Sequence, residues 1–199
     1  MPTSQQEAKV GRPRDPEIDR AILGATLRHM ADEGYSAMSI AAIAESAGVT
    51  KPALYRRWKS KADLATAALL QLQTEEPTPQ TGDLEQDLRK ALENFQRNLF
   101  RPNGMAMIGM LLSEEKRAPE LIALFRERIT RRRRQIVRSI LEAGAARGEI
   151  PREADLDVAV NLLIGSFYAK YIADAKAPRN WPERVVRLVL AALRLGSDS

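Results

Sequence analysis

The run SIAAIAESAGVTKPALYRRWKSK, residues 39–61, constrains the fold more than any other part of the chain. It carries the signals of two short helices joined by a glycine turn. Ser39 is a good N-cap, apolar residues then recur at helical spacing, and Gly48 supplies the left-handed residue that ends the first helix. Thr50 caps the second helix, whose first turn tolerates Pro52. Two helices joined in this way predict a helix-turn-helix unit.

The second of these helices is expected to have two very different sides. Because successive residues turn by about 100°, Leu54 and Trp58 fall in one narrow sector and should pack inward. Pro52, Ala53 and Arg56 fall on the opposite side. The stretch from residue 49 to 61 contains no acid and five cations, which are Lys51, Arg56, Arg57, Lys59 and Lys61. This pattern suits insertion into the major groove of DNA; the alternative is a solvated basic helix in some other bundle.

The wider sequence resembles a family of bacterial regulators. Within residues 11–72, the letters GRPRDPEI…ADEGYSAMSIAAIAESAGVTKPALYRRWKSKADL resemble the N-terminal domain of the TetR (tetracycline repressor) family. The Gly-Tyr pair after the first helix, the AxIAxxAGV core and the LYRRWKSK run occur in the family's order and spacing. Trp58 stands where the family more usually has Phe, and Met30 where an aromatic residue often packs. Residues 144–196 also resemble, more loosely, a C-terminal half common in this family.

The resemblance implies which side chains bind the DNA backbone. Tyr55 and Lys61 match the family's habitual phosphate contacts, and a phenol and an ammonium are both good donors to phosphate oxygens. Lys61 also lies in the first turn of the following helix, whose amide ends attract anions. Ser39 and Thr50, as N-caps, would present hydroxyls or backbone N–H groups to the same phosphates.

The resemblance also implies which side chains read bases. The positions that resemble base-reading ones are Lys51, Pro52, Ala53 and Arg56, with Arg57 on their flank. Arg56 is the candidate for a bidentate contact with guanine, and a phosphate contact is its alternative. Pro52 and Ala53 would touch thymine methyl groups.

A short basic segment, KVGRPR, precedes the first helix. We expect residues 1–14 to form a flexible arm. Arg12 and Arg14, on either side of a proline, could enter an adjacent minor groove, where narrow A·T tracts attract arginine. A solvated tail without fixed contacts is the alternative.

Composition excludes several other classes of protein. The 199 residues are 44% hydrophobic and 29% charged, which is ordinary for a soluble globular chain, and the net charge of +5 leans toward polyanionic partners. No cysteine is present, so there is no disulfide, thiolate metal site or cysteine nucleophile. No uninterrupted apolar run approaches the about 20 residues of a membrane span, and the N-terminus has no signal-peptide core. We therefore expect a cytoplasmic, nucleoid-associated protein without membrane contact.

Helix formers dominate almost everywhere and β-branched runs are short, so we expect an all-α fold. The first helix should start at Asp15, with Pro16 in its first position, and end at Gly34. Ser60 opens a fourth helix, with Asp63 three residues later as in a capping box.

The stretch EEPTPQTG, residues 75–82, combines prolines, glycine and polar residues and marks a domain boundary. Residues 15–75 would form the DNA-binding domain, and residues 83–199 a helical effector-binding and dimerisation domain. The helical patterns expected in the second domain cover 83–100, 104–114, 118–147, 153–175 and 181–195.

The helix over 153–175 is apolar on almost every face, which indicates burial on two sides. Together with the last helix it predicts a twofold four-helix interface between two subunits, and Gly165 would allow close approach. A dimer would also read two half-sites about 34–36 Å apart. The alternative is an intramolecular core. The expected interface residues are Leu156, Val160, Leu163, Ile164, Phe167, Val185, Val189, Ala192 and Leu193.

An effector cavity is expected between the boundary and these last helices. Methionine and aromatic side chains form adaptable cavity walls, although at helical spacing they also form plain core. The candidate lining residues are Phe95, Leu99, Met105, Met107, Met110, Leu111, Leu124, Phe125, Phe167 and Tyr171. The run Arg131–Arg134 spans a full turn, so at least one arginine must face inward or snorkel. It could bind an anion over the cavity, pack its stem with a solvated head, or form a salt bridge with another helix.

The sequence offers few candidate catalytic residues. The single histidine, His29, has no obvious acid, cysteine or serine partner, and neighbouring carboxylates point in different directions on helices. There is no phosphate-binding glycine loop and no G-x-S-x-G motif. We therefore expect no enzyme, cofactor or metal. The remaining hypotheses are a ligand-released homodimeric repressor of palindromic operator DNA, a regulator of the same fold that answers to a protein partner or activates, and a basic helical interaction module.

Overall fold

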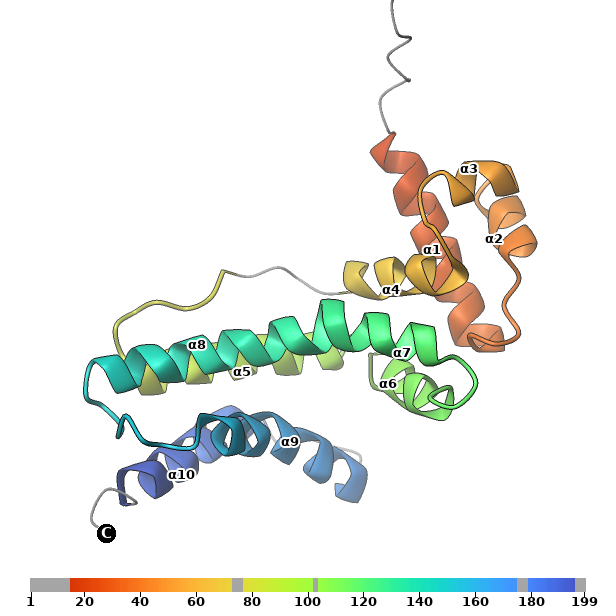
Figure 1. Cartoon of the computed structure of the whole chain (residues 1–199). Helices are drawn as coiled ribbons and strands as arrows, with labels where there is room; N and C mark the ends of the chain where they lie inside the picture. The colour runs from red at the N-terminus through yellow and green to blue at the C-terminus, as the bar shows by residue number, and fades with distance from the viewer. Residues whose placement is uncertain (1–14, 73–76, 102–103, 175–178, 196–199) are drawn as a thin grey trace, which may run out of the picture.

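The computed structural model describes residues 15–72, 77–101, 104–174 and 179–195. These residues are helical with connecting turns and form no strand, so the all-α prediction is confirmed. Figure 1 shows a small helical unit at one end of a longer helical bundle. The helices are α1 (Pro16–Glu33), α2 (Ile40–Ser46), α3 (Lys51–Tyr55), α4 (Lys61–Gln71), α5 (Leu84–Leu99), α6 (Gly104–Ser113), α7 (Pro119–Phe125), the π-helix η1 (Arg126–Thr130), α8 (Arg131–Ala146), α9 (Leu156–Asp174) and α10 (Trp181–Leu195).

The ends of the first four helices follow the capping signals in the sequence. The carboxylate of Asp15 accepts a hydrogen bond from the N–H of Glu17 at 2.9 Å, and Gly34 ends α1 with a φ of 81°. At α4, the hydroxyl of Ser60 accepts from the N–H of Asp63 at 3.1 Å. The Asp63 carboxylate in turn accepts from the N–H of Lys59 at 2.9 Å. The predicted starts of α1 and α4 are therefore confirmed.

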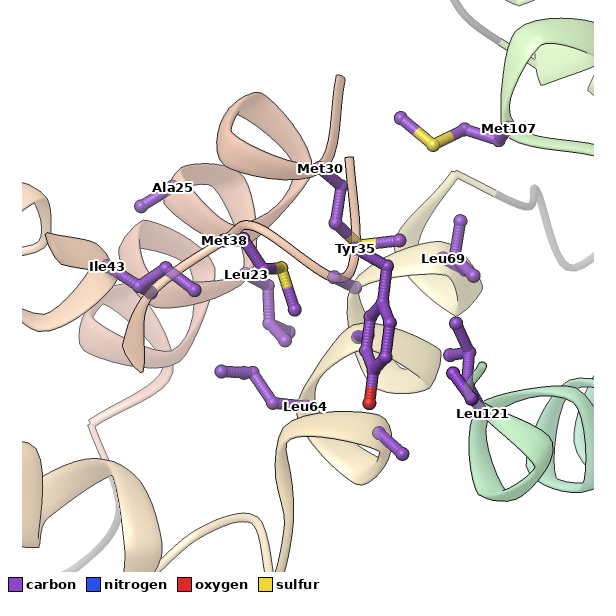
Figure 2. Close-up of a cluster of buried hydrophobic side chains, with 14 of the residues drawn as sticks. Leu23, Ala25, Met30, Tyr35, Met38, Ile43, Leu64, Leu69, Met107 and Leu121 are labelled. Atoms are coloured by element: carbon purple, nitrogen blue, oxygen red, sulfur yellow. The ribbon is translucent and has the colours of Figure 1, made fainter. Parts of the chain in front are cut away.

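The first apolar core belongs to α1–α4 but continues into α6 and α7. Helix α4 packs against α1 on one side and α7 on the other, and six of its eleven residues are buried. In Figure 2, Tyr35 and Leu69 of the small unit approach Leu121 of α7, and Met107 of α6 lies at the edge of the same cluster. The first core thus includes side chains of α6 and α7, which fold back onto α4, and the domain boundary expected over 75–82 stays a prediction.

The second core is formed by α5, α8, α9 and α10 around a cluster of aromatic rings. Phe167 is fully buried and makes edge contacts with Phe95 and Trp181, with ring centroids 5.5 and 5.3 Å away. The indole N–H of Trp181 donates to the hydroxyl of Ser166 at 2.9 Å, which ties α10 to α9.

The helical region expected over 118–147 runs without a break from Pro119 to Ala146, but it contains a π-helical segment that the sequence did not indicate. The π-helix η1 separates α7 from α8. Its wider turns shift the helical phase, and the packing partner changes across it: α7 packs against α4, whereas α8 packs against α5 and α9.

Helix α9 has one side in the second core and one side in solvent. Ala159, Val160, Leu163 and Phe167 are buried, whereas Val158, Leu162 and Ile172 are exposed. Among the described residues, α9 is the one helix long and apolar enough to cross a membrane by length and composition. Helices in the core of folded proteins meet the same criterion, and α9 packs against α5, α8 and α10.

Candidate nucleic-acid interface and ligand cavities

Helix α3 presents an exposed basic surface on the side of the small unit away from the long bundle (Figure 1). Lys51, Pro52, Tyr55 and Arg56 are exposed, whereas Leu54 is buried against α1, α2 and α4. The helix is shorter than its periodicity suggested, but the N–H of Trp58 still donates to the carbonyl of Leu54 at 3.0 Å. The inward prediction for Leu54 is confirmed, and Trp58 is half-buried against the same core.

Arg57 is engaged inside the small unit. Its Nε donates to the carboxylate of Asp19 at 2.5 Å and its Nη1 donates to the carbonyl of Ala53 at 3.2 Å. Both charged side chains are largely buried. The ion pair fastens α3 to α1, so Arg57 positions the helix, and its predicted contact with DNA stays a prediction.

Lys61 begins α4 beside the α1–α2 connection. Its ammonium donates to the carbonyl of Ser36 at 3.0 Å and lies 4.8 Å from the centre of the Tyr35 ring. Burial lowers the pKa of Lys61, and the charge of Glu114 opposes that shift. Lys61 remains cationic at neutral pH and holds a fixed position relative to α3.

The remaining predicted contact residues lie around α3 at the ends of its neighbours. Ser39 and Thr50 are exposed at the N-caps of α2 and α3. The Ser39 hydroxyl accepts from the N–H of Ala41 at 3.2 Å, while Thr50 makes no side-chain capping bond. Ala53 is half-buried on α3. Arg12 and Arg14 lie outside the described residues.

Three polar contacts, which sequence reasoning missed, fasten the small unit to the long bundle. The buried carboxylate of Glu114 accepts from the hydroxyl and the N–H of Ser36, at 2.5 and 3.3 Å. The Ser60 hydroxyl donates to Glu120 at 2.8 Å. Arg128 of η1 donates to Asp63 of α4 at 2.5 Å. These residues are separated by 60 to 78 positions, so no local signal could have paired them.

The same contacts perturb two ionisable groups. Burial, followed by the charges of Glu120 and Glu114, raises the pKa of Tyr35 to about 12. Burial works against ionisation of Asp63, but its hydrogen bonds from Arg128 and Lys59 and their charges outweigh it, so its pKa lies below the ordinary value. Tyr35 is therefore neutral and Asp63 ionised at neutral pH.

Three neighbouring cavities lie where α4, α5, α8 and α9 meet. The first, of about 200 Å³, reaches from Leu70 of α4 to Phe95 of α5 and Ile164 of α9. The second, of about 220 Å³, lies on the other side of Phe95 and Ile164. The third is a small apolar gap of about 30 Å³ beside Leu69. Arg133 lines all three.

Half of the residues expected to line a cavity do so. Those on the walls of the three cavities are Phe95, Leu99, Met107, Leu111 and Phe125. The others belong to the packed cores and do not line these three cavities, and their contact with an effector stays a prediction: Met105, Met110, Leu124, Phe167 and Tyr171. Their side chains pack between helices. The spacing of apolar residues along the sequence cannot distinguish a residue that lines a cavity from one that packs in the core.

The residues predicted for the subunit interface also divide. Val160, Leu163, Phe167 and Val189 are buried inside their own chain, so they cannot present a face to a partner. Among the rest, Ala192 is exposed, and the half-buried ones are Leu156, Ile164, Val185 and Leu193. The predicted set on α9 thus combines residues of the chain's own core, Val160, Leu163 and Phe167, with the half-buried Leu156 and Ile164, and the subunit interface itself stays a prediction.

His29 has partners that sequence reasoning did not find, which corrects that statement. Its Nδ1 lies 2.6 Å from the carboxylate of Glu33 and its Nε2 lies 3.1 Å from the hydroxyl of Ser46. The three side chains bridge α1 and α2, and none of them lines the cavities described above. Across the described ranges, no group of three or more His, Cys, Asp and Glu side chains is arranged to hold a metal ion.

Comparison with known families decides the identity of the fold. Residues 22–68, which include α2, α3 and most of α4, match the model of bacterial regulatory proteins of the tetR family. Residues 78–189 match the model of the tetracyclin repressor-like C-terminal domain. The chain belongs to the TetR family. It is a helix-turn-helix transcriptional regulator, as the sequence predicted.

Individual TetR-family proteins are similar over most of the chain. The uncharacterized HTH-type transcriptional regulator YdeS of Bacillus subtilis (strain 168) is 31% identical over 170 residues, which are 83% of this chain and 84% of YdeS. The crystal structure of the TetR-family regulator SCO0332 superposes with a TM-score of 0.66 at 25% identity, over 88% of this chain and 97% of that one. The flavonoid-responsive regulator FrrA has a TM-score of 0.71 at 22% identity, over 92% and 97%.

Proposed function

We propose that this TetR-family regulator binds a pseudo-palindromic operator as a homodimer, represses the adjacent gene, and is released by a small-molecule effector. The observation that carries the DNA-binding part is the α3 surface. Lys51, Tyr55 and Arg56 are exposed together, and no acid occurs between residues 49 and 61. Exposed cations and a phenol on one small helix suit phosphate and base contacts in a major groove.

The outer side of α9 supports the homodimer. Leu162 is 52% exposed and Ile172 82% exposed, and both belong to a stripe that repeats every three or four residues. Its members on α9 are Val158, Leu162, Gly165, Ala169 and Ile172. Leu188, Ala192 and Leu195 form an equivalent stripe on α10. An apolar stripe of this length is costly in water, and a second copy of the same two helices would cover it.

The cavities support an effector. The first cavity has one wall on α4, the helix that carries Lys61 and follows the α3 surface. A molecule bound there would contact Leu70, near the end of α4, and could therefore act directly on a helix of the DNA-binding unit. The name of FrrA describes that regulator as flavonoid-responsive, which agrees with ligand control on this fold.

The test is a footprint on the DNA that flanks the protein's own gene. We expect protection of two half-sites separated by about one helical turn or a multiple of it, with inverted sequence symmetry. The double variant Lys51→Ala/Arg56→Ala should abolish the footprint while keeping the melting temperature, because both side chains are exposed. Equal binding of the wild type to unrelated DNA of the same length would refute sequence-specific regulation.

A further inference from the structure

Arg133 lies at the junction of the three cavities, and its surroundings indicate the chemistry of the effector. It projects from α8 between the two larger cavities, beside Phe95 and Ile164. The centre of its guanidinium lies 5.5 Å from the centre of the Phe95 ring. Tyr168 of α9 is its hydrogen-bonding neighbour. Arg133 is therefore a half-buried cation that faces partly open cavities between the helices.

Among the residues that the structure describes, the walls of the three cavities contain no negative charge to balance this cation. None of the described residues that line the three cavities is Asp or Glu. In the part of the chain that the structure describes, no carboxylate forms an ion pair with Arg133. Several other arginines of η1 and α8 differ in this respect, since Arg126, Arg128 and Arg138 each pair with a carboxylate.

This arrangement costs folding free energy unless a ligand offsets it. Burial lowers the pKa of Arg133, but a guanidinium stays protonated at neutral pH, so the charge cannot be removed by titration. A half-buried charge without a counterion is less favourable than the same charge in water. The planar fork of a guanidinium matches the two oxygens of a carboxylate, and this pair is among the strongest hydrogen-bonded contacts in proteins.

Part of the wall of the first cavity is apolar, although the polar residues Thr78, Asn94, Asn98 and Arg132 also line it. Phe95, Ile136, Val137 and Ile164 supply hydrophobic wall, and Leu70 closes the side toward α4. A cavity of about 150 Å³ holds a benzene molecule. The first cavity, at about 200 Å³, therefore has room for one or two small rings or a short acyl chain.

We propose that the effector is a hydrophobic carboxylic acid whose carboxylate pairs with Arg133 and whose apolar body fills the cavity between α4, α5 and α8. This inference rests on the proposed ligand-controlled function and names the chemical class that the site takes. The competing role for Arg133 is a structural contact with the Phe95 ring, in which case neutral and anionic ligands would bind alike.

Isothermal titration calorimetry without DNA tests the inference. The probes are octanoate and 1-naphthoate, each compared at pH 7 with its neutral amide, octanamide or 1-naphthamide. We expect at least one acid to bind with one molecule per chain, and its amide to bind at least about tenfold more weakly. Arg133→Met should remove this preference by weakening the acid and leaving the amide unchanged. Arg133→Lys, which keeps the charge but removes the fork, should show an intermediate preference.

Arg131→Gln is the matched control, because Arg131 is exposed on the same turn and does not line the three cavities. It should keep the wild-type preference for the acid. The melting temperature of each variant shows whether it is folded, and the acid should raise that temperature in the wild type but not in Arg133→Met. Equal affinity for acid and amide, no binding of either acid, or an equally weakened preference in Arg131→Gln would overturn the inference.

The failure of this inference is distinguishable from failure of the proposed function. Operator binding is measured separately, without ligand. Release of the operator by neutral compounds alone would agree with the proposed function but would overturn the inference that the effector is a carboxylic acid. Acid binding that leaves operator affinity unchanged would agree with the acid-binding site at Arg133 but would overturn ligand-controlled release of the operator.

Discussion

Two neighbouring arginines on the basic surface, Arg56 and Arg57, have different surroundings. Arg56 is exposed at the end of α3, whereas Arg57 is paired with Asp19. The sequence predicted both as DNA contacts because it supplies only their charge and their phase on the helix. Which of the two is held by an acid depends on α1, more than 30 residues earlier. Arg56 is therefore the better candidate for base recognition.

Replacing Arg56 by Ala should relax the operator preference at one base pair in each half-site. The expected cost is about 1–3 kcal/mol at that position, because alanine cannot form the bidentate hydrogen bonds with guanine. The measurement is a binding titration against operators with single base changes. Lys59→Ala, which removes an exposed cation just beyond the α3 surface, is the control and should preserve the base preference. Uniform weakening over all sequences would make Arg56 a contact to phosphate.

Replacing Lys61 by Ala should weaken binding to all sequences alike and reduce the salt dependence. Its ammonium is held at a fixed place beside Ser36, where it is expected to meet a phosphate. The slope of log affinity against log salt should become shallower by about one for each phosphate that is no longer neutralised, or about two per dimer. Lys90→Ala removes the same charge from α5 in the long bundle and should leave the slope unchanged. A wild-type slope in Lys61→Ala would remove Lys61 from the interface.

At the scale of the helices, the sequence predicted what depends on near neighbours. The caps at Asp15, Ser39 and Ser60 join residues two or three positions apart, so their signals lie in short stretches of sequence. The π-helix and the inner side of α9 depend on which other helix lies opposite. When a helix is apolar on every face, its sequence does not indicate which face is buried. The buried face of α9 is determined by its packing against α5, α8 and α10.

The outer stripe of α9 gives a prediction about assembly. Leu162→Glu should dissociate the dimer to monomer in sedimentation experiments, because an unpaired carboxylate would be buried at the interface. The monomer should keep its helical content, since Leu162 is 52% exposed within the chain. Leu112→Glu is the control, because Leu112 is an exposed leucine on α6, and it should sediment as the wild type. A wild type that is monomeric at micromolar concentration would contradict the twofold arrangement.

The contact between α4 and η1 gives a prediction about pH. Asp63 has a lowered pKa in the folded protein, so its contribution to stability is complete above the unfolded value of about 4 and disappears as the pH falls through the folded value. Asp63→Asn should therefore lower the free energy of unfolding by about 1 kcal/mol at pH 7. The difference from wild type should vanish at acidic pH, as measured by urea unfolding over a pH series. A difference that is the same at every pH would show that the charge of Asp63 does not matter.

At the scale of the whole molecule, α4 belongs both to the small unit that carries α3 and to the wall of the first cavity. Leu70 near its end lines the first cavity, and Lys61 at its start donates to the carbonyl of Ser36 in the α1–α2 connection. A second connection between the cavities and α4 runs through η1. Arg128 of η1 donates to Asp63 of α4, and Arg133, which lines the cavities, lies five residues later on α8. A ligand that shifts α8 would therefore move α4 by contact with its side and by the ion pair at its start. Two α3 helices fixed to one DNA face tolerate no change in separation.

Arg128→Ala should weaken the communication between ligand and operator without changing either site. In the wild type, the acid that binds best by calorimetry should reduce operator affinity by about 5–150-fold, and by linkage it must bind the DNA-free form more tightly by the same factor. In Arg128→Ala, ligand affinity and ligand-free operator affinity should stay within about twofold of wild type, because Arg128 lies outside both sites. The ratio of operator affinities with and without ligand should shrink. Arg126→Ala, two residues earlier and paired with the exposed Glu115, should keep the wild-type ratio. If the ratio of operator affinities with and without ligand is unchanged in Arg128→Ala, the ion pair with Asp63 does not transmit the signal. Direct contact of the ligand with α4 then remains as the route.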